Sequence, residues 1–216
     1  MLARVATLLT GTVVVGLIVE HAALPGYDPV RRTISEYANA GGVTAAIARA
    51  TLAIWGVSLL VAAWLSVASA RRTSTRALLL CAALLALAAA GLILAAVFST
   101  QAVDGAVPRG VARTDSGRLH DLGAGAAQLA LLAAAIATIL TWREFRRLAS
   151  LTLVLTVIAT AGAATVAATD SSARGLRQRV LLAGALTWEF VLVTTLTRES
   201  GRGRPSRVAE SSRRAE

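Results

Sequence analysis

The stretch from Ala77 to Phe98 reads ALLLCAALLALAAAGLILAAVF and contains no charged residue. Because a helix rises about 1.5 Å per residue, roughly 20 apolar residues cross the ~30 Å hydrocarbon core of a bilayer. An unbroken apolar run, with no alternating polar positions, indicates that the surrounding solvent is lipid. The stretch therefore predicts a transmembrane helix.

Five further stretches have this character or come close to it. They run at about Val5–Leu24, Ala45–Ala68, Leu119–Thr141, Leu148–Ala168 and Val180–Thr197. We predict an all-α polytopic membrane protein, a bundle of six transmembrane helices formed by residues 1–197. Small residues at Ala88–Gly91 allow close helix–helix approach. The first stretch resembles a signal peptide, but it is long enough to span a membrane, and we expect it to stay uncleaved.

Arginine placement predicts the orientation. With the N-terminus inside, the cytoplasmic segments hold thirteen arginines and the opposite side holds nine, accompanied by half of the acids. The compact pairs Arg71–Arg72 and Arg146–Arg147 strengthen this bias. We therefore expect a cell-membrane protein with both termini in the cytoplasm.

The formal net charge of +10 is spread over short loops and the tail. This distribution favours binding to anionic membrane lipids and not to nucleic acid. Residues 198–216 are rich in Arg, Ser, Gly and Glu and predict a basic, disordered cytoplasmic tail. The single cysteine, Cys81, permits neither an intramolecular disulfide nor a cysteine-based metal site. The sequence assigns no cofactor and leaves a homo-oligomer open.

The first predicted connection, residues 25–42, has the signals of a short helix. Asp28 before Pro29 is a typical helix start, and Thr33-x-x-Glu36 fits a capping box. Its apolar residues share one face, so a short amphipathic helix lying in the membrane interface accounts for the segment. Ser35 and Glu36 are also candidate catalytic residues, Ser35 as a nucleophile.

The protein has only two histidines, and an acid adjoins each of them. His21 follows Glu20 near the end of the first span, and His120 precedes Asp121 near the start of the fourth. In the predicted topology both lie at a similar depth beneath the outer face. With Asp115 they form a candidate acid–base or metal-binding cluster. No metal-binding spacing is present, so we predict no metal site.

Polar residues at two helix starts have both structural and functional interpretations. Thr114, Asp115 or Ser116 can cap the fourth helix. Arg177 and Arg179, at the outer start of the sixth, suit a phosphate or carboxylate ligand, or simply anchor the helix at the headgroups.

Glu189 falls near the middle of the sixth predicted span. A charge at that depth costs about 3 kcal/mol on insertion scales. The carboxyl is therefore expected to face the bundle interior with a partner, or to be protonated. Arg49, near the start of the second span, is the partner that the sequence suggests.

Together these motifs resemble a bacterial and archaeal membrane family catalogued as domain of unknown function 998. The resemblance covers nearly the whole folded chain, and the residues that carry it are Pro25–Tyr27, Thr33–Tyr37, Thr114–Asp115, Gly117, His120, Gly175–Arg177, Arg179 and Trp188–Glu189. It implies six helices and an extracytoplasmic polar cluster. It implies no established activity.

Three functions follow as hypotheses. The first is a non-catalytic protein whose polar cluster binds lipids or a small ligand, through Glu20, His21, Arg177, Arg179 and Glu189. The second is an outer-leaflet lipid-modifying enzyme with His120 as acid–base residue, Asp115 or Asp121 orienting it, and Ser35 or water as nucleophile. The third is a proton-coupled transporter using Glu189. A haem held by His21 and His120 has weaker support.

Overall fold

The computed structural model describes residues 2–24, 26–73, 76–104, 106–141 and 173–202. This part of the chain forms five long helices, and its β-structure is limited to an isolated bridge between Val103 and Ala106. The helices are α1 (Leu2–Ala23), α2 (Gly42–Thr73), α3 (Arg76–Val97), α4 (Asp115–Thr141) and α6 (Arg174–Arg202). The predicted span Leu148–Ala168 lies outside the described residues, so the count of six remains a prediction. The predicted tail is described only as far as Arg202, where α6 ends.

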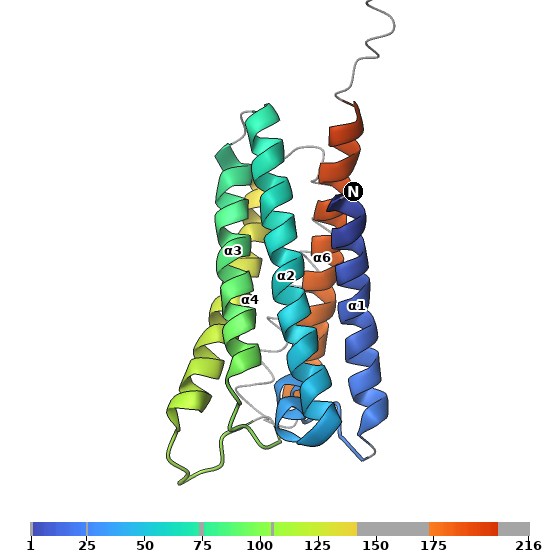
Figure 1. Ribbon diagram of the computed structural model, residues 1–216. Coiled ribbons are helices and arrows are strands. Elements are labelled where there is room, and N and C mark those ends of the chain that lie inside the picture. The colour runs from blue at the N-terminus through green and yellow to red at the C-terminus, as the bar shows by residue number, and fades with distance from the viewer. Residues whose placement is uncertain (1, 25, 74–75, 105, 142–172, 203–216) are drawn as a thin grey trace, which may run out of the picture.

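The helices run side by side (Figure 1), with α2 between α1 and α3, and α4 against α3. α3 and α4 cross at Gly91 and Gly123. A Cβ added to either glycine would lie 2.5–2.6 Å from the carbonyl oxygen of the other. The close approach expected at Ala88–Gly91 is thus confirmed, because hydrogen in place of a methyl group lets the two backbones touch.

Large apolar side chains cover the outside of this bundle. Leu8 is 70% exposed and Leu129 is 71% exposed, although both lie within long apolar helices. All five helices are long and apolar enough to cross a membrane. An exterior of this kind is stable in lipid and not in water, so the chain is a multi-pass membrane protein.

The two longest described connections gather at one end of the bundle. Residues 26–41, 98–104 and 106–114 lie there beside the start of α6, and we call this the loop end. The start of α1 and the end of α6 lie together at the opposite end (Figure 1). Which side of a membrane the loop end faces remains a prediction.

A short helix does form in the first connection, as a 3-10 helix, η1 (Ile34–Asn39). It packs against α2 and buries Ile34, Tyr37 and also Glu36, which is 7% exposed. Its docking on the bundle explains this burial, and its position in a membrane interface remains a prediction. Asp28 caps a turn and not the helix itself, since its Oδ1 accepts the backbone N–H of Val30 at 2.9 Å.

Candidate functional site

The turn after Asp28 is held directly against the first turn of α6. The backbone N–H of Gly175 donates to the carbonyl of Arg31 at 3.2 Å, and that of Leu176 to the carbonyl of Val30 at 3.0 Å. The first N–H groups of a helix have no partner within it, so these loop carbonyls cap α6. Gly175 is required at this contact, because a Cβ there would overlap the carbonyl oxygen of Arg32.

Arg179, one turn further along α6, joins this turn to α1. Its Nη1 donates to the carbonyls of Pro29 at 2.7 Å and Arg32 at 2.8 Å, and its Nε donates to Nε2 of His21 at 2.6 Å. The other ring nitrogen of His21, Nδ1, lies 2.6 Å from the carbonyl of Leu17. Since a carbonyl only accepts, Nδ1 carries the proton and Nε2 offers its lone pair. Two predicted ligand-binding residues, His21 and Arg179, are thus in direct contact.

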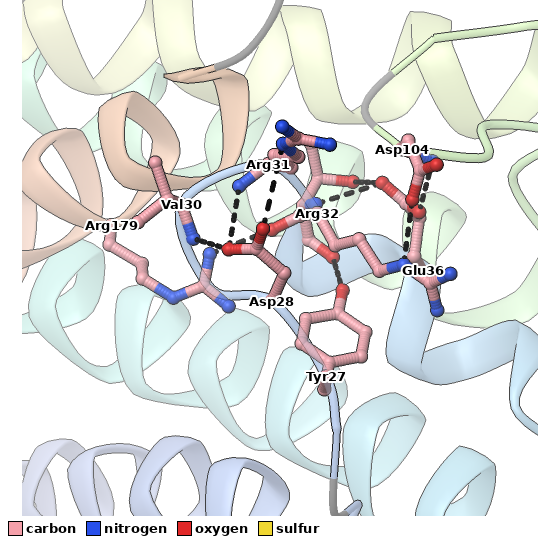
Figure 2. Close-up of polar contacts among 9 residues, drawn as sticks. Tyr27, Asp28, Val30, Arg31, Arg32, Glu36, Asp104 and Arg179 are labelled. Atoms are coloured by element: carbon pink, nitrogen blue, oxygen red, sulfur yellow. Dashed lines mark hydrogen bonds and ion pairs between the residues drawn. The ribbon is translucent and has the colours of Figure 1, made fainter.

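Two tyrosines pack beside this pair. The rings of Tyr27 and Tyr37 stack with centroids 3.8 Å apart, and the Tyr27 hydroxyl donates to the carbonyl of Thr33. Figure 2 shows Tyr27 beneath the turn, with Arg179 and Glu36 on either side. Burial raises the pKa of both phenols, so both remain protonated at physiological pH.

Three buried polar groups in this region have no hydrogen-bond partner among the described residues. They are both carboxyl oxygens of Glu20, the hydroxyl of Tyr37 and Nη2 of Arg179. Glu20 and Tyr37 are completely buried. Arg179 lies close enough to both of these residues to act on them electrostatically. Unpaired buried polar groups are uncommon, so three together mark this region as the candidate site.

Glu36 links the connection between α1 and α2 to the connection between α3 and α4. Its Oε1 accepts the backbone N–H of Thr33 at 2.8 Å, as the capping motif predicts, and its Oε2 accepts the backbone N–H of Asp104 at 2.9 Å. Arg32 completes the link through a 2.8 Å ion pair with Asp104, which raises the pKa of its guanidinium. These contacts, drawn in Figure 2, give Glu36 a structural role between two loops.

His120 lies at the other side of the loop end and holds α4 to α3. It is 2% exposed, and its Nδ1 lies 2.9 Å from the carbonyls of both Ala95 and Phe98. Ala95 is in the last turn of α3 and Phe98 directly follows that helix, so their carbonyls are among those that a helix end leaves without partners. His120 therefore caps the end of α3.

The acids expected beside His120 point to other partners. Asp121 forms a 2.9 Å ion pair with Arg113, and Asp115 lies 3.7 Å from Arg118 on the protein surface. In the described part of the chain, no contact joins either acid to His120. The cap of α4 is Thr114, one of three predicted candidates, whose hydroxyl accepts the backbone N–H of Gly117 at 3.1 Å.

Ser35 lies at the opposite side of the loop end, toward α6. Its hydroxyl is 3.5 Å from Nε2 of Gln178, and both residues line an apolar cavity of about 170 Å³ between α2, α3, α4 and α6. Gln178 also accepts the backbone N–H of Ile34 at 2.5 Å. Gln178 was not among the predicted site residues, although a glutamine between two candidate arginines at a helix start was a usable signal. Arg177 is half-buried beside it and has a partner of its own.

Glu189 is completely buried between α1, α2 and α6, far along the helix from Arg179. Trp55 donates from Nε1 to Oε2 at 2.8 Å, and the Ser58 hydroxyl lies 2.6 Å from Oε1. The expected partner, Arg49, instead donates to the hydroxyl of Ser99 at 2.7 Å. That prediction was wrong, because Arg49 lies at the loop end of α2 and reaches the connection that follows α3.

A groove of about 440 Å³ runs between α1 and α6. Its walls are mainly apolar, from Val14, Leu17 and Leu182 among others, and His21 and Arg179 lie at its loop end. The groove thus combines an apolar length with one cationic terminus. This combination matches a molecule that has an apolar chain and an anionic head.

A family model described as "Protein of unknown function (DUF998)" matches residues 7–195. No curated protein and no solved structure matches the chain. The match extends from the first turns of α1 almost to the end of α6, and so includes the turn, Gly175, Arg179 and Glu189. The chain belongs to the DUF998 family of proteins of unknown function.

Proposed function

We propose that the protein binds a phospholipid at the loop end of the bundle, with the lipid phosphate at Arg179 and an acyl chain in the groove between α1 and α6. The supporting observation is a guanidinium that forms no ion pair with any described residue and lies at the end of an apolar groove. The arginine distribution predicts that this end faces away from the cytoplasm, so the lipid would come from the outer leaflet.

The environment of Arg179 favours an anionic oxygen. The three hydrogen bonds that its Nε and Nη1 donate go to neutral acceptors, and within the described part of the chain Nη2 is buried without a hydrogen-bond partner. A partly buried charge is costly unless an opposite charge compensates it. Glu20 lies near but does not hydrogen-bond to it. A phosphate oxygen meets this need, because a guanidinium offers planar N–H donors suited to phosphate.

The shape of the groove favours a lipid over a free ion. Its volume of about 440 Å³ lies in the range of small-molecule sites, ≈ 300–1,000 Å³, and its lining is mainly aliphatic. Inorganic phosphate would leave that length unused. An acyl chain would fill it and place its headgroup beside His21 and Arg179.

The experiment is a binding measurement with two ligands that share their acyl chains. Delipidated protein in detergent is titrated with phosphatidylglycerol or with the matching diacylglycerol, and bound lipid is counted by native mass spectrometry. Wild type should retain phosphatidylglycerol at least tenfold more tightly. Arg179→Gln should lose that preference, whereas Arg118→Gln, which removes an exposed arginine at the same end, should keep it.

A second variant tests the groove without touching the arginine. Ala183 lines the groove and is exposed, so Ala183→Phe should fill it and weaken binding of both ligands. Equal retention of phosphatidylglycerol and diacylglycerol by wild type would overturn the proposal. Unchanged binding by Ala183→Phe would place the lipid elsewhere.

A further inference from the structure

The two contacts of Glu189 belong to a longer chain of hydroxyl groups. Ser58 Oγ lies 3.2 Å from Thr10 Oγ1, and either atom can be the donor of this hydrogen bond. The Thr10 hydroxyl in turn lies 3.0 Å from the carbonyl of Ala6. Ser58 and Ala6 are completely buried and Thr10 is 5% exposed. This series of hydrogen bonds therefore runs from α6 through α2 to α1 within the apolar interior.

We propose that Glu189, Ser58 and Thr10 form a reversible proton-binding site in which the hydroxyl chain reverses direction as the carboxyl gains or loses a proton. With the proton bound, Oε1–H donates to Ser58, Ser58 to Thr10, and Thr10 to the carbonyl of Ala6. With the proton absent, Thr10 donates to Ser58 and Ser58 donates to the carboxylate. Trp55 donates to Oε2 in both states, so no heavy atom needs to move.

The proton balance of this site is simple. Solvent water supplies the proton and takes it back, and only O–H bonds are made and broken. Rotation of the two hydroxyl groups completes the change, because a hydroxyl can both donate and accept. Serine and threonine supply this freedom, whereas an arginine or lysine partner would fix the carboxyl in its ionised form.

The surroundings of Glu189 contain no such fixed charge in the described residues. Four elements pack against α6, and their charged or titratable residues lie toward the helix ends or at η1. No described contact joins any of these charged or titratable residues to Glu189. The residues are Arg4, Glu20 and His21 on α1, Arg49, Arg71 and Arg72 on α2, Asp115, Arg118, His120 and Asp121 on α4, and Glu36 and Tyr37 on η1. In an apolar interior the neutral acid is the favoured resting form.

Infrared difference spectroscopy of the full-length protein tests this site independently of lipid binding. A protonated carboxyl and a carboxylate have separate stretching bands, and Glu189→Gln identifies which band belongs to this residue. Glutamine keeps the size of the side chain and can still accept from Trp55. Asp115→Asn, at an exposed acid, is the control that should leave the band unchanged.

The expected result is an acid band at neutral pH that shifts in D2O and converts to a carboxylate band as the pH is raised. Ser58→Ala should move the midpoint of that conversion, since it removes the hydroxyl that accepts from the protonated carboxyl and donates to the carboxylate. A carboxylate band at every pH would overturn the proposal. An acid band that persists until the protein unfolds would also overturn it, because Glu189 would then be only a structural hydrogen-bonding group.

Discussion

The Nε–H of Arg179 donates to Nε2 of His21 at 2.6 Å, so α6 and the last turn of α1 are joined through a histidine that accepts. A charged imidazole would carry hydrogens on both nitrogens and would oppose this bond. The contact therefore needs the tautomer that the carbonyl of Leu17 selects at Nδ1. The guanidinium of Arg179 therefore holds together one turn of α1, one turn of α6 and the turn at Pro29–Arg32.

The first prediction concerns the shape of that guanidinium. Arg179→Lys keeps the positive charge but loses the planar fork, so one ammonium group cannot reach His21, Pro29 and Arg32 together. We expect the free energy of unfolding to fall by about 1.5–3 kcal/mol, the range for hydrogen bonds to charged groups. Thermal unfolding in detergent measures this. Arg118→Lys, on the exposed surface, should change the stability by less than about 0.5 kcal/mol.

A loss in Arg118→Lys as large as in Arg179→Lys would contradict this explanation. It would mean that arginine at the loop end matters for general reasons, such as headgroup attraction, and not for its three specific acceptors.

The second prediction concerns Gly175. Gly175→Ala places a Cβ against the carbonyl oxygen of Arg32 and 2.6 Å from that of Pro29, so the turn must move away from α6. Overpacking of this kind costs about 1–3 kcal/mol. Gly11→Ala is the matched control, because its Cβ would meet nothing within 4 Å. It should be neutral or stabilising by up to about 1 kcal/mol, since alanine favours helix. Equal melting temperatures for the two variants would exclude the close contact.

The sequence predicted the five described helices well, because length and unbroken apolar character define a membrane span. It also predicted the structural role of local signals. Thr114 caps α4 and Glu36 binds the backbone of Thr33, as their spacing indicates. Such signals act within a few residues and need no knowledge of how the helices pack.

Contacts between helices were much harder to predict. Arg49 was expected to pair with Glu189, but the actual partners are Trp55 and Ser58. Helices that are apolar on every side have no hydrophobic face to indicate which side meets which neighbour. A usable signal was present, since Trp55 and Ser58 are three residues apart and therefore share one face of α2.

The third prediction tests the crossing of α3 and α4. Gly123→Ala brings a Cβ 2.6 Å from the carbonyl oxygen of Gly91, so the two helices must separate. We expect a loss of about 1–3 kcal/mol in the free energy of unfolding. Gly125→Ala lies two residues further on the same helix, where an added Cβ meets nothing within 4 Å, and should not destabilise. If Gly125→Ala is the more damaging change, the crossing point lies elsewhere.

The last prediction separates a structural His120 from a catalytic one. His120→Ala removes the donor that caps the carbonyls of Ala95 and Phe98, which should cost about 1–3 kcal/mol. His120→Gln restores an N–H donor and should recover part of that loss.

Membrane lipids are then compared among cells with wild type, either variant at matched abundance, or no protein. Because His120 has no acid partner in the described contacts, we expect the variants to leave lipid composition as wild type does. A lipid species altered by wild type and by neither variant would instead favour the lipid-modifying enzyme and identify its substrate class.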